Sequence, residues 1–431
     1  MSVNLRWFAM NFNRSSEQYN LITTLQYVGA SVNRSEALDR YTENRDLLKE
    51  WRFIYADYAE EGPFKLRRQL FEDGCFVSTV FRGNSLWVIG DKVVSNHGTL
   101  AFKIGTGTYL DSNAASYIRS FAYEDTPSDE VMKGCHSMKE NFDHEEMKSF
   151  NPYLYLFEAS NNKSQKSIEK IRETISAIFS LKMMGNPLSL SWAKEFKAQY
   201  ELSSKKEADA FLAQFFKEAE LGHFSQMESL TDLMELIIIK AKLIEYSSNR
   251  SPENKFEELL NVANSELSIL MFRELIICAD ILFRSNKTQI SQKLHSLQNK
   301  KRPLNVIRNC ARDLGMVRMM DLLTNSIVDG NESAFYVASI VTFDKDVMDI
   351  IKVTEVNAIA LHTESQEVHI IFNAEVQAWL SEKLGDKRLQ RLSSLMTFNS
   401  FDTRYKNRGH YHIKQQLISD RERLVKLLNQ R

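Results

Sequence analysis

The sequence predicts an α/β fold in which a parallel sheet is interrupted by a large helical insertion. Short β-rich segments occur before about residue 110, apolar residues recur at helical spacing from about residue 165 to 330, and strand-like segments return after that region. This order of strand, many helices and further strand fits one sheet with an insertion better than separate all-α and all-β domains.

Length and composition predict a globular protein with more than one folded unit. A chain of 431 residues exceeds the size of one ordinary hydrophobic core. The 43% hydrophobic and 26% charged residues, with only 15 glycines and 6 prolines, exclude a disordered or fibrous chain. We expect an N-terminal α+β part at 1–100, an α/β core with the insertion at 101–355, and a C-terminal α/β extension at 356–431.

The N-terminal part is expected to begin with helices and to continue with β-hairpins. Residues 15–61 are predicted to be helical, because Asn33 precedes Glu36 at the spacing of a capping box and an amphipathic run continues through Trp51 and Ile54. Short β-rich runs follow at 75–81, 86–89 and 92–94, separated by glycine-containing steps. These runs predict hairpins.

Helical patterns dominate the middle of the chain. Ser167 is expected to cap one helix, and Ser251 followed by a proline marks the start of another. Strands are predicted again near the C-terminus, before a charged helical tail from about residue 374. These strands are 335–343, 357–361 and 368–372.

Charge and cysteine usage limit the classes of partner. The formal net charge of -1 gives no overall attraction to nucleic acid, so any such binding requires local clusters of Lys and Arg. The four cysteines lie far apart in the chain and are expected to be reduced core thiols. No apolar leader segment and no stretch of about 18 apolar residues is present, so we expect a cytoplasmic protein that does not enter a membrane.

Two aspartates directly follow predicted strands. Asp111 ends the apolar segment that begins at residue 99, and Ser112 or Asn113 can cap the helix that follows. Asp344 follows the strand at 335–343 and precedes a short helix. Ligands of open α/β sheets gather at the carboxyl ends of the strands, which makes both aspartates candidate site residues. Simple capping of a helix is the competing interpretation.

Two further carboxylates lie on apolar faces of predicted helices. Glu274, on a helix expected around 265–283, has apolar neighbours at helical spacing, so its charge requires a buried Arg, a proton or a metal ion as compensation. Asp313 lies at the edge of another apolar face. A salt bridge to Arg308 or Arg312 competes there with a functional role.

A meeting of these four carboxylates in space predicts a metal-dependent active site. Carboxylates crowded together require cations, and such a cluster holds Mg²⁺ or Mn²⁺. One or two such ions orient an attacking water and stabilise the leaving oxygen of a phosphodiester. The hypothesis requires that all four side chains lie near one common point.

At this point the sequence resembles the PIN-domain ribonuclease superfamily over roughly residues 100–355. The segment Leu110-Asp111-Ser112-Asn113 is similar to the end of the family's first strand, and Thr342-Phe343-Asp344 to its last. Glu274 and Asp313 match, in type and order, the Glu and Asp that the family places on helices between them. The resemblance implies a three-layer fold with a parallel sheet, and metal-dependent RNA cleavage in which Asp111, Glu274, Asp313 and Asp344 are catalytic residues and ligands of Mg or Mn. It also suggests a toxin or phage-defence role.

Cationic and polar residues close to these carboxylates in the sequence are candidates for substrate binding. Phosphate contacts supply most of the affinity for nucleic acid, and the segment around Asp313 is rich in Lys and Arg. The substrate is expected to be RNA, or single-stranded nucleic acid more generally, although a solvated charged face is the competing interpretation. The candidates are Asn113, Lys301, Arg302, Arg308 and Arg312.

Two alternatives remain open from the sequence. Arg404 and His410 resemble the Arg-x(4–6)-His signature of HEPN ribonucleases, metal-free enzymes that usually act as dimers, which implies a homo-oligomer. The chain is alternatively a non-catalytic binding or regulatory protein with a protein partner. In that case each carboxylate would lie beside its own Arg or Lys.

Overall fold

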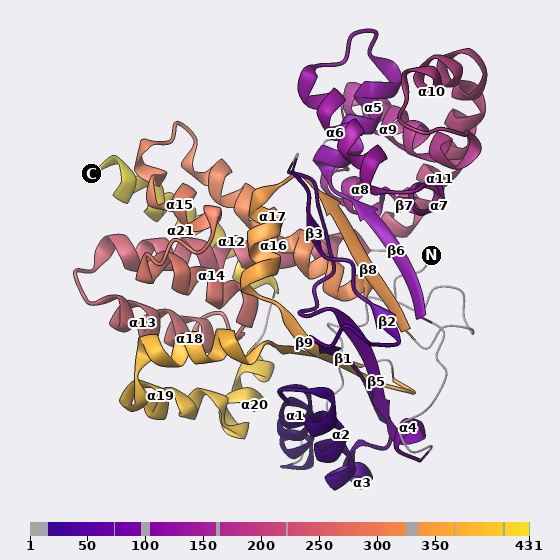
Figure 1. Cartoon of the computed structure of the whole chain (residues 1–431). Coiled ribbons are helices and arrows are strands. Elements are labelled where there is room, and N and C mark those ends of the chain that lie inside the picture. The colour runs from indigo at the N-terminus through magenta and orange to yellow at the C-terminus, as the bar shows by residue number, and fades with distance from the viewer. Residues whose placement is uncertain are drawn as a thin grey trace.

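A computed structural model describes most of the chain, which forms two five-stranded sheets surrounded by helices (Figure 1). The mixed α/β class predicted from the sequence is confirmed. Within the described part of the chain, no helix combines the length and apolar character needed to cross a membrane. The described residues are 16–72, 74–95, 104–160, 164–220, 223–324, 335–365, 367–407 and 410–430.

The N-terminal helices are shorter than expected and lead into a strand. The helices are α1 (Ser16–Gly29), α2 (Arg34–Glu43) and α3 (Arg45–Leu48), and β1 (Trp51–Asp57) follows. The cap at Asn33 is confirmed, since its side chain accepts a hydrogen bond from the Glu36 amide at 3.0 Å. The prediction that the helix extends through Trp51 and Ile54 is wrong. Both residues are buried in β1, a central strand with neighbours on each side, where a continuous apolar run is favoured.

The first sheet joins the two ends of the chain. Its strand order is β10-β9-β1-β5-β2, with every neighbouring pair antiparallel. Strands from the N-terminal part and from the C-terminal extension therefore share one sheet, and hydrogen bonding does not separate the ranges 1–100 and 356–431. The strands beside β1 are β2 (Phe64–Lys65), β5 (Ser85–Gly90), β9 (Val356–His362) and β10 (Val368–Phe372).

The second sheet is mixed rather than wholly parallel. Its order is β3-β4-β8-β6-β7; β6 is parallel to β7 and β8, whereas β4 is antiparallel to β8 and to β3. The hairpins predicted at 75–94 are wrong, because β4 and β5 belong to different sheets and Asp91–Ser95 is a helix, α4. The strands are β3 (Gln69–Leu70), β4 (Phe76–Ser78), β6 (Ile104–Leu110), β7 (Phe150–Asn151) and β8 (Phe335–Thr342). Residues 99–103 of the predicted segment before β6 lie outside the described residues.

Between β6 and β8 the described chain is almost entirely helical, as the sequence predicts. Ser164, and not Ser167, caps α9. The helix expected around 265–283 is divided, since Ser268 has a φ of 55°, which a right-handed helix cannot accommodate. The α-helices are α5 (Ser112–Tyr123), α6 (Asp129–Asn141), α7 (His144–Lys148), α8 (Tyr153–Ala159), α9 (Gln165–Met183), α10 (Leu190–Glu195), α11 (Glu201–Glu220), α12 (His223–Ser247), α13 (Pro252–Ser265), α14 (Phe272–Phe283), α15 (Gln289–His295) and α16 (Pro303–Leu323); Phe196–Tyr200 is a π-helix and Leu297–Asn299 a 3₁₀ turn.

The C-terminal part is helical apart from β9 and β10. Helix α21 packs along α12, and α17 packs against α16. The helices are α17 (Lys345–Val353), α18 (Ala374–Leu384), α19 (Asp386–Leu392), α20 (Phe398–Asn407) and α21 (His410–Asn429), with a 3₁₀ turn at Ser393–Met396.

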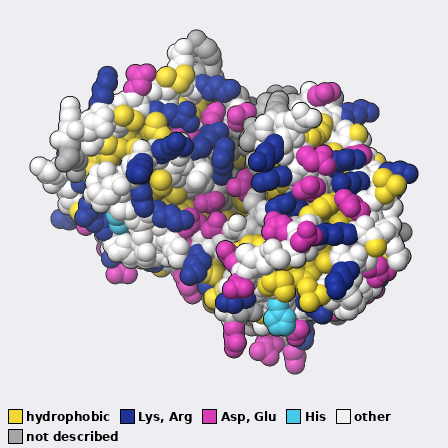
Figure 2. All heavy atoms as spheres, turned by 90° about the horizontal axis from the view of Figure 1, so that it is seen from above, with side chains coloured by type: hydrophobic (Ala, Val, Ile, Leu, Met, Phe, Trp, Pro, Cys, Tyr) yellow, Lys and Arg dark blue, Asp and Glu magenta, His cyan; other side chains and the backbone are white. Residues whose placement is uncertain are grey.

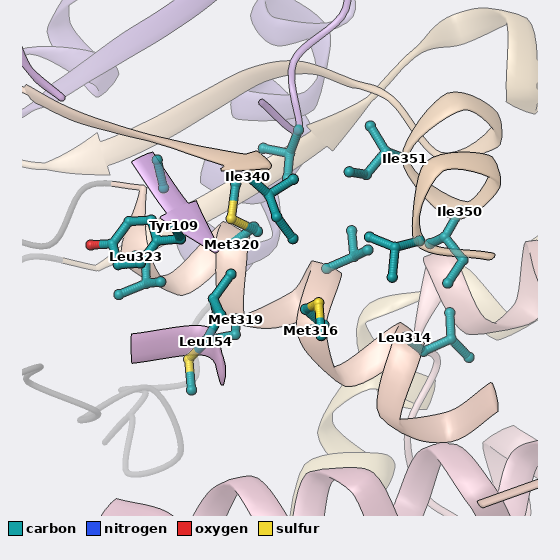
Figure 3. Packing of buried hydrophobic residues seen from close by; sticks show 14 of the residues in the cluster. Tyr109, Leu154, Leu314, Met316, Met319, Met320, Leu323, Ile340, Ile350 and Ile351 are labelled. Atoms are coloured by element: carbon teal, nitrogen blue, oxygen red, sulfur yellow. The ribbon is translucent and has the colours of Figure 1, made fainter. Parts of the chain in front are cut away.

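The core beside the second sheet fixes the position of α16. Met320 and Leu323 of α16 gather beside Tyr109 of β6 and Ile340 of β8 (Figure 3), and all four side chains are buried. Burial of side chains of this size stabilises the fold by about 1.5–3 kcal/mol each. This packing holds the preceding turns of α16 near the ends of the two strands.

Candidate active site

The strands β6 and β8 end side by side at one edge of the second sheet. They are neighbours in parallel register, with Leu110 opposite Val341, and the Asp111 amide donates a hydrogen bond to the Val341 carbonyl at 3.1 Å. Asp344 follows β8 two residues beyond its end. The two aspartates that follow strands therefore lie at the same edge of the sheet, where the sequence placed them.

A threonine hydroxyl connects these two aspartates. Thr342 Oγ1 donates a hydrogen bond to Oδ2 of Asp111 and accepts one from the Asp344 amide at 2.8 Å. The other oxygen of Asp111 accepts a hydrogen bond from the Ala114 amide at 2.6 Å, so Asp111 itself caps α5. Ser112 and Asn113 do not provide that cap. Asp111 thus has both the capping role and a place beside a second carboxylate.

Three further carboxylates gather at this edge. Burial and the negative charges of Asp344, Asp346 and Glu158 raise the pKa of Asp313 well above its usual range, although the charge of Lys293 acts in the opposite direction. Electrostatic interactions of this strength require short separations. Asp313 of α16 therefore belongs to the same cluster as the aspartates at the strand ends.

Asp346 was not a candidate from the sequence. It lies in the first turn of α17, is 2% exposed, and pairs through Oδ2 with Nζ of Lys293. Its Oδ1 is buried and has no hydrogen-bond partner among the described residues. The sequence did contain an indication, since Asp344 and Asp346 alternate with a lysine directly after β8.

Glu158 also escaped the sequence analysis. It lies near the end of α8, accepts a hydrogen bond from the Ser112 hydroxyl, and contributes to the raised pKa values of both Asp111 and Asp313. Helix α8 follows β7, which is parallel to β6 but has only two residues. A strand of that length leaves no periodic pattern from which the sequence could predict a third strand end.

The carboxyl edge of the second sheet faces the viewer in Figure 2. Seen from this direction, Asp and Glu side chains lie in the middle of the face, and Lys and Arg side chains gather on both sides of them. Such an arrangement attracts a cation at its centre and a polyanion at its margins.

The Asp111 carboxyl is held in an environment that disfavours its charge. Burial, together with the charges of Asp344 and Glu158, outweighs the hydrogen bonds from Thr342 and Ala114 and raises the pKa of Asp111 to about 7. An unfolded aspartate ionises near pH 4. Ionisation therefore costs more in the folded protein than in the unfolded chain.

This difference predicts a pH dependence of stability. Between about pH 4 and pH 7 the unfolded chain releases the Asp111 proton while the folded protein keeps it, so the free energy of unfolding falls as the pH rises through this range. We expect Asp111→Asn to show a smaller decline than the wild-type protein when urea unfolding is followed at several pH values without divalent cations. Equal declines in the two proteins would contradict the raised pKa of Asp111.

Glu274 lies in a different group of charges. Its two oxygens accept hydrogen bonds from Nη2 of Arg318 at 2.9 and 3.1 Å, and the carboxylate is fully buried. Arg318 also lies 3.5 Å from Asp321, which pairs with the buried Arg273. An arginine compensates the buried charge of Glu274, which is one of the three compensations that the sequence allowed. The structure therefore does not bring Glu274 to the cluster at the strand ends.

The substrate-binding candidates divide into exposed and occupied residues. Lys301 and Arg302 are exposed at the start of α16, and Asn113 is exposed in the first turn of α5. Arg312 is partly buried beside Asp313 in α16. Arg308 is occupied, because its Nη1 lies 2.6 Å from Asp232 and 3.0 Å from Glu235 of α12. It joins α12 to α16, and its expected role in substrate binding is not supported.

Arg404 is also engaged in internal contacts. Its guanidinium is buried and donates hydrogen bonds at 2.6 Å to Asn264 and to the Leu395 carbonyl. Arg404 lies in α20 rather than in the loop expected from the sequence, and His410 begins α21; the His410 side chain lies outside the described residues. These contacts join α20 to α13 and occupy the guanidinium of Arg404.

The cluster offers the ligand atoms that Mg²⁺ and Mn²⁺ prefer, namely carboxylate oxygens accompanied by hydroxyls. Among the described residues, no three Asp, Glu, His or Cys side chains stand close enough to enclose a metal ion. The unpartnered Oδ1 of Asp346 and the raised pKa values of Asp111 and Asp313 nevertheless indicate uncompensated negative charge. A cation would relieve it.

Comparison with known proteins does not assign a family. No family model matches the sequence, no curated protein matches it, and no solved structure matches the fold. The function is therefore inferred from the chemistry of the acidic cluster, supported by the motif-level resemblance.

Proposed function

We propose that this protein is a metal-dependent nuclease that hydrolyses phosphodiester bonds of RNA at the acidic cluster. The observation that carries the proposal is the junction of β6 and β8, where one threonine hydroxyl bridges Asp111 to the segment bearing Asp344. Asp313 and Asp346 lie within electrostatic reach of that junction, and the negative charge is only partly neutralised. The resemblance extends the proposal to a toxin or phage-defence effector.

The residues that would hold Mg²⁺ or Mn²⁺ are Asp111, Asp313 and Asp344, with Asp346 and Glu158 beside them. Such an ion supplies Lewis acidity and lowers the pKa of a bound water. The protein's own contribution is positional, because helix caps and a shared hydroxyl fix Asp111 and Asp344 at the strand ends. Glu158 replaces Glu274 in this proposal as the glutamate on a helix between the two strands.

The second sheet and its helices would form the PIN-like core. Helices α5 and α8 contact β6, while α16 packs against β8 and carries Asp313. Three layers of α, β and α are the arrangement that the resemblance implies. The antiparallel strands β3 and β4 and the long helical segment between β6 and β8 would then be additions to it.

The proposal is tested by incubating the purified full chain with labelled single-stranded RNA and DNA in Mn²⁺, and again after addition of EDTA. Cleavage of RNA that requires Mn²⁺ and stops with EDTA is the expected result. Cleavage that continues in EDTA would contradict a metal-dependent mechanism. Absence of cleavage at every Mn²⁺ concentration would favour a non-catalytic binding protein.

Substrate binding is expected to depend on the exposed cations at the start of α16. Replacing Lys301 and Arg302 by Ala removes two cations, so the salt dependence of RNA affinity should weaken by about 0.7 per lost phosphate contact, as for single strands. Fluorescence anisotropy with labelled RNA in EDTA, over a series of KCl concentrations, measures this slope. Lys194→Ala with Lys206→Ala is the matched control, since both lysines are exposed on α10 and α11. An equal change in the control would reject a specific role for Lys301 and Arg302.

A further inference from the structure

Lys293 approaches the acidic cluster from the solvent side. Its side chain is 46% exposed, whereas its ion-pair partner Asp346 is 2% exposed. The lysine lies in α15, and the amide of Gln289 at the start of that helix donates a hydrogen bond to Asp349 of α17 at 2.9 Å. Helix α15 is therefore fixed beside α17, while the end of the Lys293 side chain reaches water.

The preceding segment is fixed as well. Asp280 of α14 accepts hydrogen bonds from the amides of Lys287 and Thr288 at 2.9 and 3.0 Å, and from the Thr288 hydroxyl at 2.7 Å. These contacts define the entry into α15. The position of Lys293 is thus determined by the fold, although its ammonium group retains freedom of movement.

The ion pair only partly satisfies Asp346. Lys293 binds Oδ2, and the buried Oδ1 has no hydrogen-bond partner among the described residues. The carboxylates of Asp313 and Asp344 are electrostatic neighbours of the same group. One monovalent ammonium therefore faces several carboxylates, and a divalent cation would balance their charge better.

Exchange between these cations has a low cost on the lysine side. A half-exposed ammonium on a flexible four-carbon stem regains hydration when it leaves its partner, and exposed ion pairs contribute about 0–1 kcal/mol. Asp346 cannot leave in the same way, because it is buried in the first turn of α17. The carboxylate is fixed, and its cation is replaceable.

On the basis of the proposed function, we propose that Lys293 is an exchangeable counter-cation of the site. It neutralises Asp346 in the protein without a divalent cation and competes with that cation for Asp346. The Lys293–Asp346 pair therefore sets the affinity of the site for the divalent cation. Lys293 acts here through Asp346 and is a positioning residue, not a ligand.

The test is isothermal titration of the full chain with Mn²⁺ at constant pH and ionic strength. Lys293→Met is expected to bind Mn²⁺ about three- to tenfold more tightly than the wild type, which corresponds to the loss of a half-exposed competitor. Lys345→Met is the matched control, because Lys345 is an exposed lysine of α17 between Asp344 and Asp346. It reports any general effect of removing a positive charge and should change the affinity less than Lys293→Met.

A double-mutant comparison identifies the pair itself. Asp346→Asn should weaken Mn²⁺ binding, and adding Lys293→Met to it should cause no further change. The proposal is overturned if Lys293→Met binds Mn²⁺ no more tightly than the wild type. It is also overturned if Lys345→Met tightens binding equally, or if Lys293→Met still tightens binding in the Asp346→Asn background.

These outcomes separate the proposal from the nuclease assignment. The expected Mn²⁺ affinities without any RNA cleavage would reject the nuclease and support the role of Lys293. Mn²⁺-dependent cleavage with unchanged affinity in Lys293→Met would reject the role of Lys293 and support the nuclease. If none of these proteins binds Mn²⁺, both proposals are wrong.

Discussion

Replacing Asp111 or Asp344 by Asn is expected to lower Mn²⁺-dependent RNA cleavage by a factor on the order of 10²–10³, because each substitution removes a charge that would hold the metal and a few kcal/mol of transition-state stabilisation with it. Asparagine has nearly the shape of aspartate and can still accept the hydrogen bond that Ala114 donates to Asp111. The change is therefore one of charge more than of fold. Single-turnover cleavage of labelled RNA measures it.

Stability measurements distinguish this loss from misfolding. Since ionised Asp111 is disfavoured by burial, Asp111→Asn should be at least as stable as the wild type above pH 7 in the absence of metal. A variant that loses cleavage and also unfolds at lower urea concentration would indicate damage to the fold. Cleavage within about twofold of the wild type in both variants would reject the acidic cluster as the active site.

Glu274→Gln provides the matched control for a carboxylate outside the cluster. Its partner is Arg318, so the substitution leaves a partly buried guanidinium without its full counter-charge. We expect a lower melting temperature with cleavage retained at temperatures where the variant is folded. Loss of cleavage without loss of stability would instead return Glu274 to the candidate metal ligands.

The sequence predicted the strand-end aspartates because the relevant information is local. An apolar segment, an aspartate and the start of a helix follow one another within a few residues at both Asp111 and Asp344. Neighbouring parallel strands then bring the two aspartates to one edge without further information. Glu158 was missed because the two-residue strand β7 carries no comparable local pattern.

The errors arose where distant segments decide the structure. Glu274 was recognised as a buried carboxylate, but its partner Arg318 lies 44 residues away on another helix, and no local pattern selects an arginine over a metal. The segment containing Trp51 and Ile54 fits a helical period, yet it pairs with β9 from the other end of the chain. Burial on both faces of a central strand permits an apolar run that resembles a helix in sequence.

The largest effect on stability is expected at the ion pair between Arg273 and Asp321, where Arg273→Met should destabilise the protein by about 3–5 kcal/mol. Both side chains are fully buried, and two nitrogens of Arg273 donate to the two oxygens of Asp321. Arg273 Nε also donates to the Thr354 hydroxyl at 2.9 Å. Removal of the arginine leaves Asp321 with only the more distant Arg318 to balance its charge.

Urea unfolding compares this variant with Arg172→Met, which removes a partly exposed pair with Asp209 and should cost less than about 1 kcal/mol. Arg273→Met combined with Asp321→Leu should recover much of the lost stability, because no unpaired charge is then buried. Equal losses for Arg273→Met and Arg172→Met would show that the buried network contributes no more than a surface pair. Since this network links α14, α16 and the end of α17 without contributing to the acidic cluster, folded Arg273→Met should still cleave RNA, and that result would separate the scaffold from the site.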